Sequence, residues 1–182
     1  RGLIPSFALT DITLQDAQGR ETLRLPLVVV ALSPRSLLGL GFEQLYVERP
    51  VLDVRRSADG QIWVAGFPLP RSDAGGNAGA KWVFSQPEIA IRRGTIHWTD
   101  ALREAPTLTL TEVDAVLRNV HRSHALRFDA SPPPEWGERL GLRAAFEHAL
   151  LTGSAGRWRE WDGQVYADLG RIDLAWLRRY VD

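Results

Sequence analysis

The sequence contains no cysteine and no methionine among its 182 residues. Without cysteine, disulfide bonds, thiol catalysis and cysteine-ligated metal sites are excluded. Methionine is missing even at the first position, which is Arg1, and a strand pattern begins almost at once. We therefore expect the chain to be a piece of a longer protein, which leaves room for a signal peptide or membrane anchor outside it.

Net charge and long apolar runs are also missing. The 22 basic and 22 acidic residues cancel, so nothing indicates a nucleic-acid partner or a polybasic membrane patch. The longest apolar stretch, residues 25–32, is interrupted by Pro26 and is far too short to span a bilayer. The remaining composition, 45% apolar and 24% charged, is that of an ordinary globular domain with a sizeable core.

Catalytic and metal-binding motifs are absent as well. Residues 73–82 are glycine-rich but lack the Gly-Lys-Ser/Thr ending of a phosphate loop, so we interpret them as a loop. His121 and His124 have the spacing of two metal ligands, but a metal needs further ligands and the sequence places none nearby. We expect both histidines to be solvated in a turn, and we expect no enzyme activity, no metal and no cofactor.

What the chain does contain is an internal repeat. Residues 7–16 alternate apolar and polar side chains and end in an Asp-Ala-Gln-Gly turn, and residues 89–100 repeat this pattern so that Asp16 and Asp100 lie 84 positions apart. The strands that follow, residues 23–25 and 108–110, match at an offset of 85. A repeated β-meander is typical of a stackable sheet whose long face carries the function.

The pattern predicts a mainly β fold in one unit, residues 1–182, with internal repeats at about 6–67 and 82–130 followed by residues 131–182. We expect one curved antiparallel sheet of repeated β-meanders with an open groove. Short helices are expected near 34–39, where Ser33 and Pro34 form a helix start, and at 174–181, where Asp173 is the cap. Two such helices are too small to cover a sheet of about ten strands.

Individual elements follow from the same alternation. A loop is expected at 68–80, and a bulge at Gly163 in the last strand. Residues 139–148 are interpreted as a strand, with a helix as the alternative. The other strands are expected at 6–15, 21–32, 42–48, 50–56, 61–64, 87–99, 106–118, 124–130 and 161–169.

The seven tryptophans have more than one possible role. Large aromatic side chains on strands usually belong to a core, and we expect that role for most of them. Contact with lipid or a partner, and stacking on carbohydrate, are the alternatives. The tryptophans are Trp63, Trp82, Trp98, Trp136, Trp158, Trp161 and Trp176.

Several phrases occur in a definite order along the chain. They are residues 9–20, 28–40 with its Ser-Pro-Arg-Ser-Leu-Leu segment, 50–60, 91–100 with Gly-Thr-Ile-His-Trp, 132–144 with three prolines, 161–169 and 173–177. Over essentially the whole chain, this order resembles the AsmA-like family of bacterial envelope proteins, most closely its YhdP branch. The resemblance implies a membrane-proximal segment of a periplasmic protein that is anchored in the inner membrane by an N-terminal helix.

The same resemblance implies a role in lipid transport between the inner and outer membranes and in outer-membrane integrity. Its expected partners are phospholipid acyl chains and neighbouring repeats of the parent chain, and it supplies no catalytic residues. Physically, an uncovered apolar sheet face marks a binding site, and burial of each acyl CH₂ contributes roughly 0.8 kcal/mol. Six residues are candidates for the lipid groove: Leu9, Ile12, Leu14, Ile91, Ile96 and Trp98.

Two details of this prediction remain open. The spacing from Leu9 to Ile12 and from Ile91 to Ile96 breaks strict alternation, so we expect a bulge to restore the face in each strand. The six residues could instead belong to a closed core. In that case the chain would act as a scaffold that pairs with envelope proteins through its sheet edges, and exposed edges would also favour self-association. A hydrolase or carbohydrate module would need a concave polar site, which the sequence does not reveal.

Overall fold

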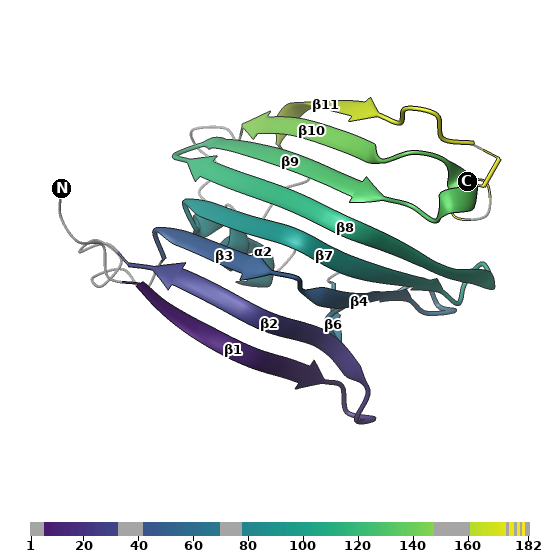
Figure 1. Cartoon of the computed structure of the whole chain (residues 1–182), viewed down its shortest axis with the longest axis horizontal. Helices are drawn as coiled ribbons and strands as arrows, with labels where there is room; N and C mark the ends of the chain where they lie inside the picture. Colours follow the sequence, from purple (N-terminus) through teal and green to yellow (C-terminus); the bar gives the residue numbers. More distant parts are fainter. Residues whose placement is uncertain are drawn as a thin grey trace.

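The computed structural model describes residues 6–32, 42–69, 78–147 and 161–173, together with residues 175, 176, 178 and 180. These residues form a mainly β structure with very little helix, in which the strands join in one large mixed sheet (Figure 1). The strands are β1 (Ser6–Gln15), β2 (Glu21–Ala31), β3 (Gln44–Glu48), β4 (Val51–Arg56), β5 (Ile62–Val64), β6 (Phe67–Pro68), β7 (Glu88–Asp100), β8 (Ala105–Val120), β9 (Ser123–Ser131), β10 (Leu140–Glu147) and β11 (Asp162–Asp168). The helices are α2 (Ala78–Ser85) and the short 3₁₀ helix η1 (Pro134–Trp136).

The sheet runs from β1 at one edge to β11 at the other. Between β2 and β7, strands β3 and β4 follow one another along the same line, separated only by Arg49 and Pro50. From β7 to β11 each strand pairs antiparallel with the next strand along the chain. The sheet therefore has eight strand positions, β1, β2, β3 with β4, and β7 to β11, while β5 and β6 form a hairpin beside β4.

Local sequence explains two of the hairpin turns. In the β1–β2 turn, the Asp16 carboxylate accepts hydrogen bonds from the backbone N–H groups of Gln18 and Arg20, both at 2.9 Å. Gly19 takes a φ of 75°, which glycine adopts without steric cost. Gly60 has the same role in the β4–β5 turn, at a φ of 80°. Both hairpins lie where the sequence predicts them.

The expectation of a fully antiparallel sheet is wrong at one junction. Strands β3 and β4 pair with β7 in parallel. The physical reason is that the connection from β4 to β7 contains α2, so that β7 begins at the end of the sheet where β3 begins. Parallel neighbours require such a crossover, whereas a tight turn can join only antiparallel strands. The internal repeat itself stays a prediction.

Other expectations can be compared element by element. Residues 140–147 form strand β10, so the strand interpretation of this region is confirmed. Residues 78–80 belong to α2 and not to the predicted loop. The helix expected near 34–39 lies outside the described residues, and of the helix expected at 174–181 the structure describes only four positions.

The bulge predicted at Gly163 is wrong. Gly163 pairs with Phe146 in an unbroken register along β10 and β11. A Cβ atom at Gly163 would lie 2.2 Å from Cδ1 of Phe146, so this glycine makes room for the aromatic ring on the neighbouring strand. A glycine inside a strand can mark either a bulge or a close approach of a neighbouring group, and here it marks a close approach.

Candidate functional surface

Two rows of apolar side chains cross the sheet from edge to edge. Residues that are partners in neighbouring strands lie on the same face of a sheet, so the register of successive pairs defines each row. Together we call the two rows the apolar rows. The first row consists of Phe7, Val30, Leu45, Ile89, Leu117, Leu126, Ala144 and Val165. The second row consists of Leu9, Val28, Val47, Ile91, Ala115, Phe128, Leu142 and Ala167.

A line of backbone irregularities lies beside the second apolar row, and we call it the bulge line. Asp11 in β1, Arg49 between β3 and β4, Arg93 in β7 and Glu112 in β8 all have positive φ, between 47° and 54°. Positive φ is uncommon outside glycine. The pairing register shifts beside Arg93 and beside Glu112, as expected for β-bulges. The bulge line therefore resets the alternation in the neighbouring strands β7 and β8.

Beyond the bulge line the apolar face continues with a further group of partners. In β1 and β2, Ile12 pairs with Leu25 and Leu14 pairs with Leu23. Ile12 and Leu25 both pack against the buried cluster of Val28, Val30 and Val47, which belongs to the apolar rows. Both sides of the bulge line thus contribute to one apolar face.

The structure places the six predicted groove residues on this face. Leu9 and Leu14 in β1 are 45% and 37% exposed, and Ile12 and Ile91 pack against the valine cluster. Ile96 and Trp98 are half-buried beyond the bulge line, paired with Leu52 and Val54 of β4. The bulge expected between Ile91 and Ile96 is confirmed. Between Leu9 and Ile12 the register does not shift, and Asp11 with its φ of 54° stands there instead.

Burial along the apolar rows is incomplete. Of their sixteen side chains, four are buried, eight are half-buried and four are exposed. The exposed ones are Phe7 and Leu9 in β1 and Val165 and Ala167 in β11, so both rows end at an exposed strand. The apolar rows are therefore least covered at the two edge strands.

Helix α2 lies behind the sheet in Figure 1, near β3 and β7. A buried polar network holds it there. The Gln86 side chain, 1% exposed, donates to the Trp82 carbonyl at 3.0 Å and accepts from the backbone N–H of Phe42 at 2.9 Å. The Asn119 amide in β8 donates to the Gln86 carbonyl at 2.6 Å. These bonds satisfy backbone groups at the end of α2 that would otherwise be unpaired.

His124 extends this network, and the expectation that it is solvated is wrong. It is 2% exposed, and its Nδ1 lies 2.7 Å from Oδ1 of Asn119. Its ring stacks on Trp161 with centroids 4.1 Å apart and meets Phe84 of α2 edge-on at 5.3 Å. The partners come from segments distant in sequence, so spacing alone could not reveal this burial. His121 is exposed, as expected.

The tryptophans differ from the predicted core role. Only Trp136 among those described is buried, and it packs against Trp176 and Tyr180 at ring centroid distances of 6.4 and 5.3 Å. Trp63 and Trp82 are 38% and 44% exposed. Trp98, Trp161 and Trp176 are half-buried, and Trp158 lies outside the described residues. Most tryptophans therefore stand at partly open positions.

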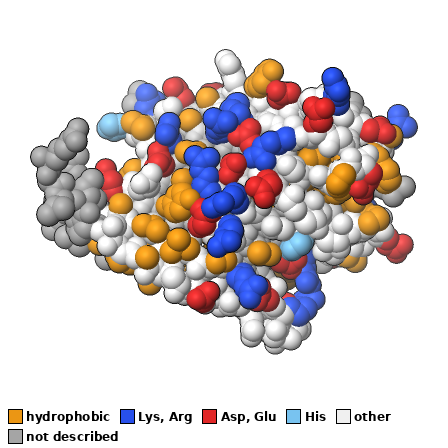
Figure 2. Space-filling model, viewed as in Figure 1, with side chains coloured by type: hydrophobic (Ala, Val, Ile, Leu, Met, Phe, Trp, Pro, Cys, Tyr) orange, Lys and Arg blue, Asp and Glu red, His pale blue; other side chains and the backbone are white. Residues whose placement is uncertain are grey.

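The opposite face of the sheet carries charged side chains, and we call it the charged face. Figure 2 views this face and shows a band of arginines and carboxylates over its middle. Within the band, Arg118 pairs with Glu88 at 2.7 Å, Arg139 with Asp114 at 2.8 Å, and both Arg127 and Arg143 with Asp129 at 2.8 and 2.9 Å. Most arginines of the band are matched by carboxylates on the same or a neighbouring strand.

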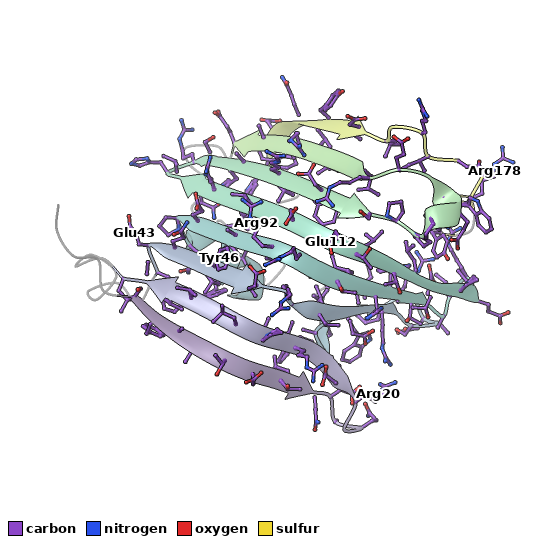
Figure 3. All side chains as sticks on the ribbon, viewed as in Figure 1. Arg20, Glu43, Tyr46, Arg92, Glu112 and Arg178 are labelled. Atoms are coloured by element: carbon purple, nitrogen blue, oxygen red, sulfur yellow. The ribbon has the colours of Figure 1, made fainter. Side chains whose placement is uncertain are left out.

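Glu48 is an enclosed carboxylate of the charged face, at 8% exposure. It accepts hydrogen bonds from the Tyr46 hydroxyl and the Arg93 guanidinium, and these partners hold its pKa below the ordinary value. The same contact with Glu48 raises the pKa of Tyr46. Tyr46 and Arg92 both lie in front of the sheet in Figure 3. Arg93 belongs to the bulge line, so its ion pair with Glu48 connects the bulge line to the charged face.

Hydrogen bonds from arginine have the same effect elsewhere in the band. A bond from Arg118, supported by one from Gln44, lowers the pKa of Glu88 even though burial opposes the change. At Asp129 burial also opposes the shift, but the bonds from Arg127 and Arg143 outweigh it and the pKa is lowered. These groups form a structural network of ion pairs between arginines and carboxylates.

Over the residues that the structure describes, no group of three histidine or acidic side chains is placed to hold a metal ion. No helix within that part of the chain is long and apolar enough to cross a membrane. No family model, curated protein or solved structure matches the chain. The functional argument therefore rests on the apolar face itself.

Proposed function

We propose that the chain is a segment of a periplasmic lipid-transport protein of the AsmA-like type. In this proposal the apolar rows hold the acyl chains of phospholipids that move between the inner and outer membranes. One observation carries it: both rows cross all eight strand positions without a single polar side chain.

The geometry of the rows suits a sliding ligand. Eight strand positions at about 4.8 Å spacing give a length of roughly 34 Å, longer than one acyl chain. Each CH₂ group buried there contributes roughly 0.8 kcal/mol, and no hydrogen bond fixes its position along the row. An acyl chain would therefore be held against the sheet and remain free to shift from one strand to the next.

The ends of the rows support continuity with further repeats. Phe7 and Leu9 on β1 and Val165 on β11 are 43%, 45% and 59% exposed. A strand added at either edge by a neighbouring repeat would lengthen both rows without a break. If the rows belonged to a closed core, these edge residues would be buried, as Val30 and Val47 are in the interior of the sheet.

Native mass spectrometry of protein purified from a lipid-containing host tests this proposal. We expect phospholipid to co-purify with the wild-type chain and with Val116→Asp on the charged face. Leu117→Asp places the same charge in the first apolar row and should abolish the lipid-bound mass. A clean apo mass for the wild type, or equal lipid occupancy in both variants, would contradict the proposal.

A second candidate function is a scaffold that pairs with envelope proteins or with itself through the sheet edges. The observation in its favour is β11, because all seven of its residues are exposed and its outer backbone edge has no neighbouring strand in the described part of the chain. Exposed edges invite strand addition. Light scattering at rising protein concentration separates the cases: dimers support edge pairing, and a strictly monomeric chain argues against it.

A further inference from the structure

A cavity of about 440 Å³ lies at the end of the sheet where the β1–β2 turn faces β4, β5 and the end of β7. Asp53 and Arg55 of β4 line it, and they alternate with Leu52 and Val54, which belong to the apolar face. The cavity is therefore on the charged-face side of the sheet, separate from the apolar rows. Arg20, labelled in Figure 3, marks the turn that forms one wall.

This wall is rigidly built. Oδ1 of Asp16 accepts from the backbone N–H groups of Gln18 and Arg20, and Oδ2 accepts from Nε of Arg20 at 2.7 Å. The bond from the Arg20 backbone is the largest cause of the lowered pKa of Asp16. On the other side, Gly66 packs against Thr22. A Cβ atom added at Gly66 would lie only 3.1 Å from Oγ1 of Thr22. The shape of the cavity is thus set by locked turns.

Polar groups inside the cavity remain open to a ligand. Oδ2 of Asp53 accepts from Nε of Arg55 at 2.6 Å. Across the described residues, Oδ1 of Asp53, the Thr99 hydroxyl and the Trp63 indole N–H have no protein partner, and all three side chains line the cavity. The Trp63 ring is 38% exposed, so an aromatic surface stands beside one acceptor and two donors.

The charges of the lining are balanced. Arg20 pairs with Asp16 at 2.7 Å, Arg55 with Asp53 at 2.6 Å, and Arg56 with Asp100 at 3.1 Å. A phosphate or carboxylate ligand would need an unmatched cation, and each guanidinium of this wall is already neutralised. A neutral ligand that offers several donors and acceptors fits better.

We propose that this cavity binds a neutral saccharide, with a pyranose ring stacked on Trp63 and its hydroxyl groups bonded to Asp53, Arg55 and Thr99. A sugar ring has an apolar C–H surface that suits an indole and a rim of hydroxyl groups that both donate and accept. The volume lies within the range of small-molecule sites, roughly 300–1,000 Å³. The site is independent of lipid transport, because it uses the other side of the sheet.

The test is NMR titration of the ¹⁵N-labelled chain with glucose, galactose and N-acetylglucosamine, with inorganic phosphate and glucuronate as charged comparators. We expect at least one neutral sugar to shift the Trp63 indole and Thr99 amide signals, with a Kd of about 1 mM. Asp53→Asn and Thr99→Val should each weaken binding about tenfold, the effect of one lost hydrogen bond. Trp82→Phe, on α2, is the matched control and should leave binding unchanged.

The dispersion of the NMR signals shows whether each variant is folded. Thr99→Val keeps the volume of the side chain, so it remains interpretable if Asp53→Asn unfolds. Three results would overturn the proposal. One is the absence of shifts with any neutral sugar at about 50 mM, far above the expected Kd. The others are tighter binding of phosphate or glucuronate, and sugar binding that Thr99→Val does not weaken.

Discussion

The two faces of this sheet are made by the same strands, yet they reach stability in different ways. On the apolar face, Val28, Val30 and Val47 are 5%, 2% and 7% exposed, and the residues of the apolar rows in β1 and β11 are exposed. On the charged face, arginines and carboxylates pair across strands and stay partly in water. A monomeric domain normally covers its apolar face, and the incomplete cover of this one is the basis of the acyl-chain site that we propose.

The largest expected effect comes from placing one charge on each face. Val47→Asp buries an unpaired carboxylate inside the valine cluster, which should lower the free energy of unfolding by about 4 kcal/mol. Val116→Asp introduces the same group on the charged face, beside Arg92 and Arg127, and should cost less than about 1 kcal/mol. Urea unfolding followed by circular dichroism measures both. Equal losses would mean that the two faces do not differ as described.

An intermediate effect is expected at Glu48. Glu48→Gln removes the carboxylate that accepts from Tyr46 and Arg93, and we expect a loss of about 2 kcal/mol at pH 7. Because the pKa of Glu48 is lowered in the folded state, its contribution is present above the unfolded value and is lost as pH falls through the folded pKa.

Unfolding experiments from pH 7 down to the acid range test the sign of this effect. The wild type should lose stability below its ordinary glutamate pKa faster than Glu48→Gln does, so that the two curves converge in acid. Arg118→Gln, which removes a more exposed partner of the band, is the control and should change stability little. Parallel curves for the wild type and Glu48→Gln would argue against a stabilising ion pair at the bulge line.

The smallest effect on stability is expected at the rim of the apolar face. Leu9→Asp replaces a side chain that is 45% exposed, so the free energy of unfolding should fall by less than about 1 kcal/mol. Lipid co-purification should nevertheless drop sharply, because the charge stands in the second apolar row. A large loss of stability would indicate a closed core at this edge, and normal lipid content would remove Leu9 from the groove.

The apolar face could be predicted because period-two alternation survives in each strand. Leu9 and Ile91 lie on the same row, and the bulge between Ile91 and Ile96 follows from the broken spacing alone. Alternation cannot predict which strand lies next to a given strand in the sheet. The patterns of β1 and β7 are nearly the same, yet β1 is an exposed edge and β7 stands in the middle of the sheet.

Other features depend on contacts between distant segments. The parallel junction needs the crossover through α2, and no local signal in residues 57–87 marks its direction. His124 is buried by Trp161 and Phe84, and Glu48 is paired with Arg93, 45 positions away. The cavity beside Trp63 likewise combines the β1–β2 turn with β4, β5 and β7. Residue types and spacing specify the faces of the strands, while these long-range contacts decide what each face meets.

Site-specific photo-crosslinking in a lipid-containing envelope tests the open apolar face most directly. A photoreactive residue at Leu9 or Val165 lies in an apolar row, whereas one at the adjacent Thr10 or Tyr166 lies on the charged face of the same exposed strand. The account predicts phospholipid adducts at positions 9 and 165 and none at 10 and 166. Equal labelling of adjacent positions, or no lipid adduct at either apolar position, would contradict it.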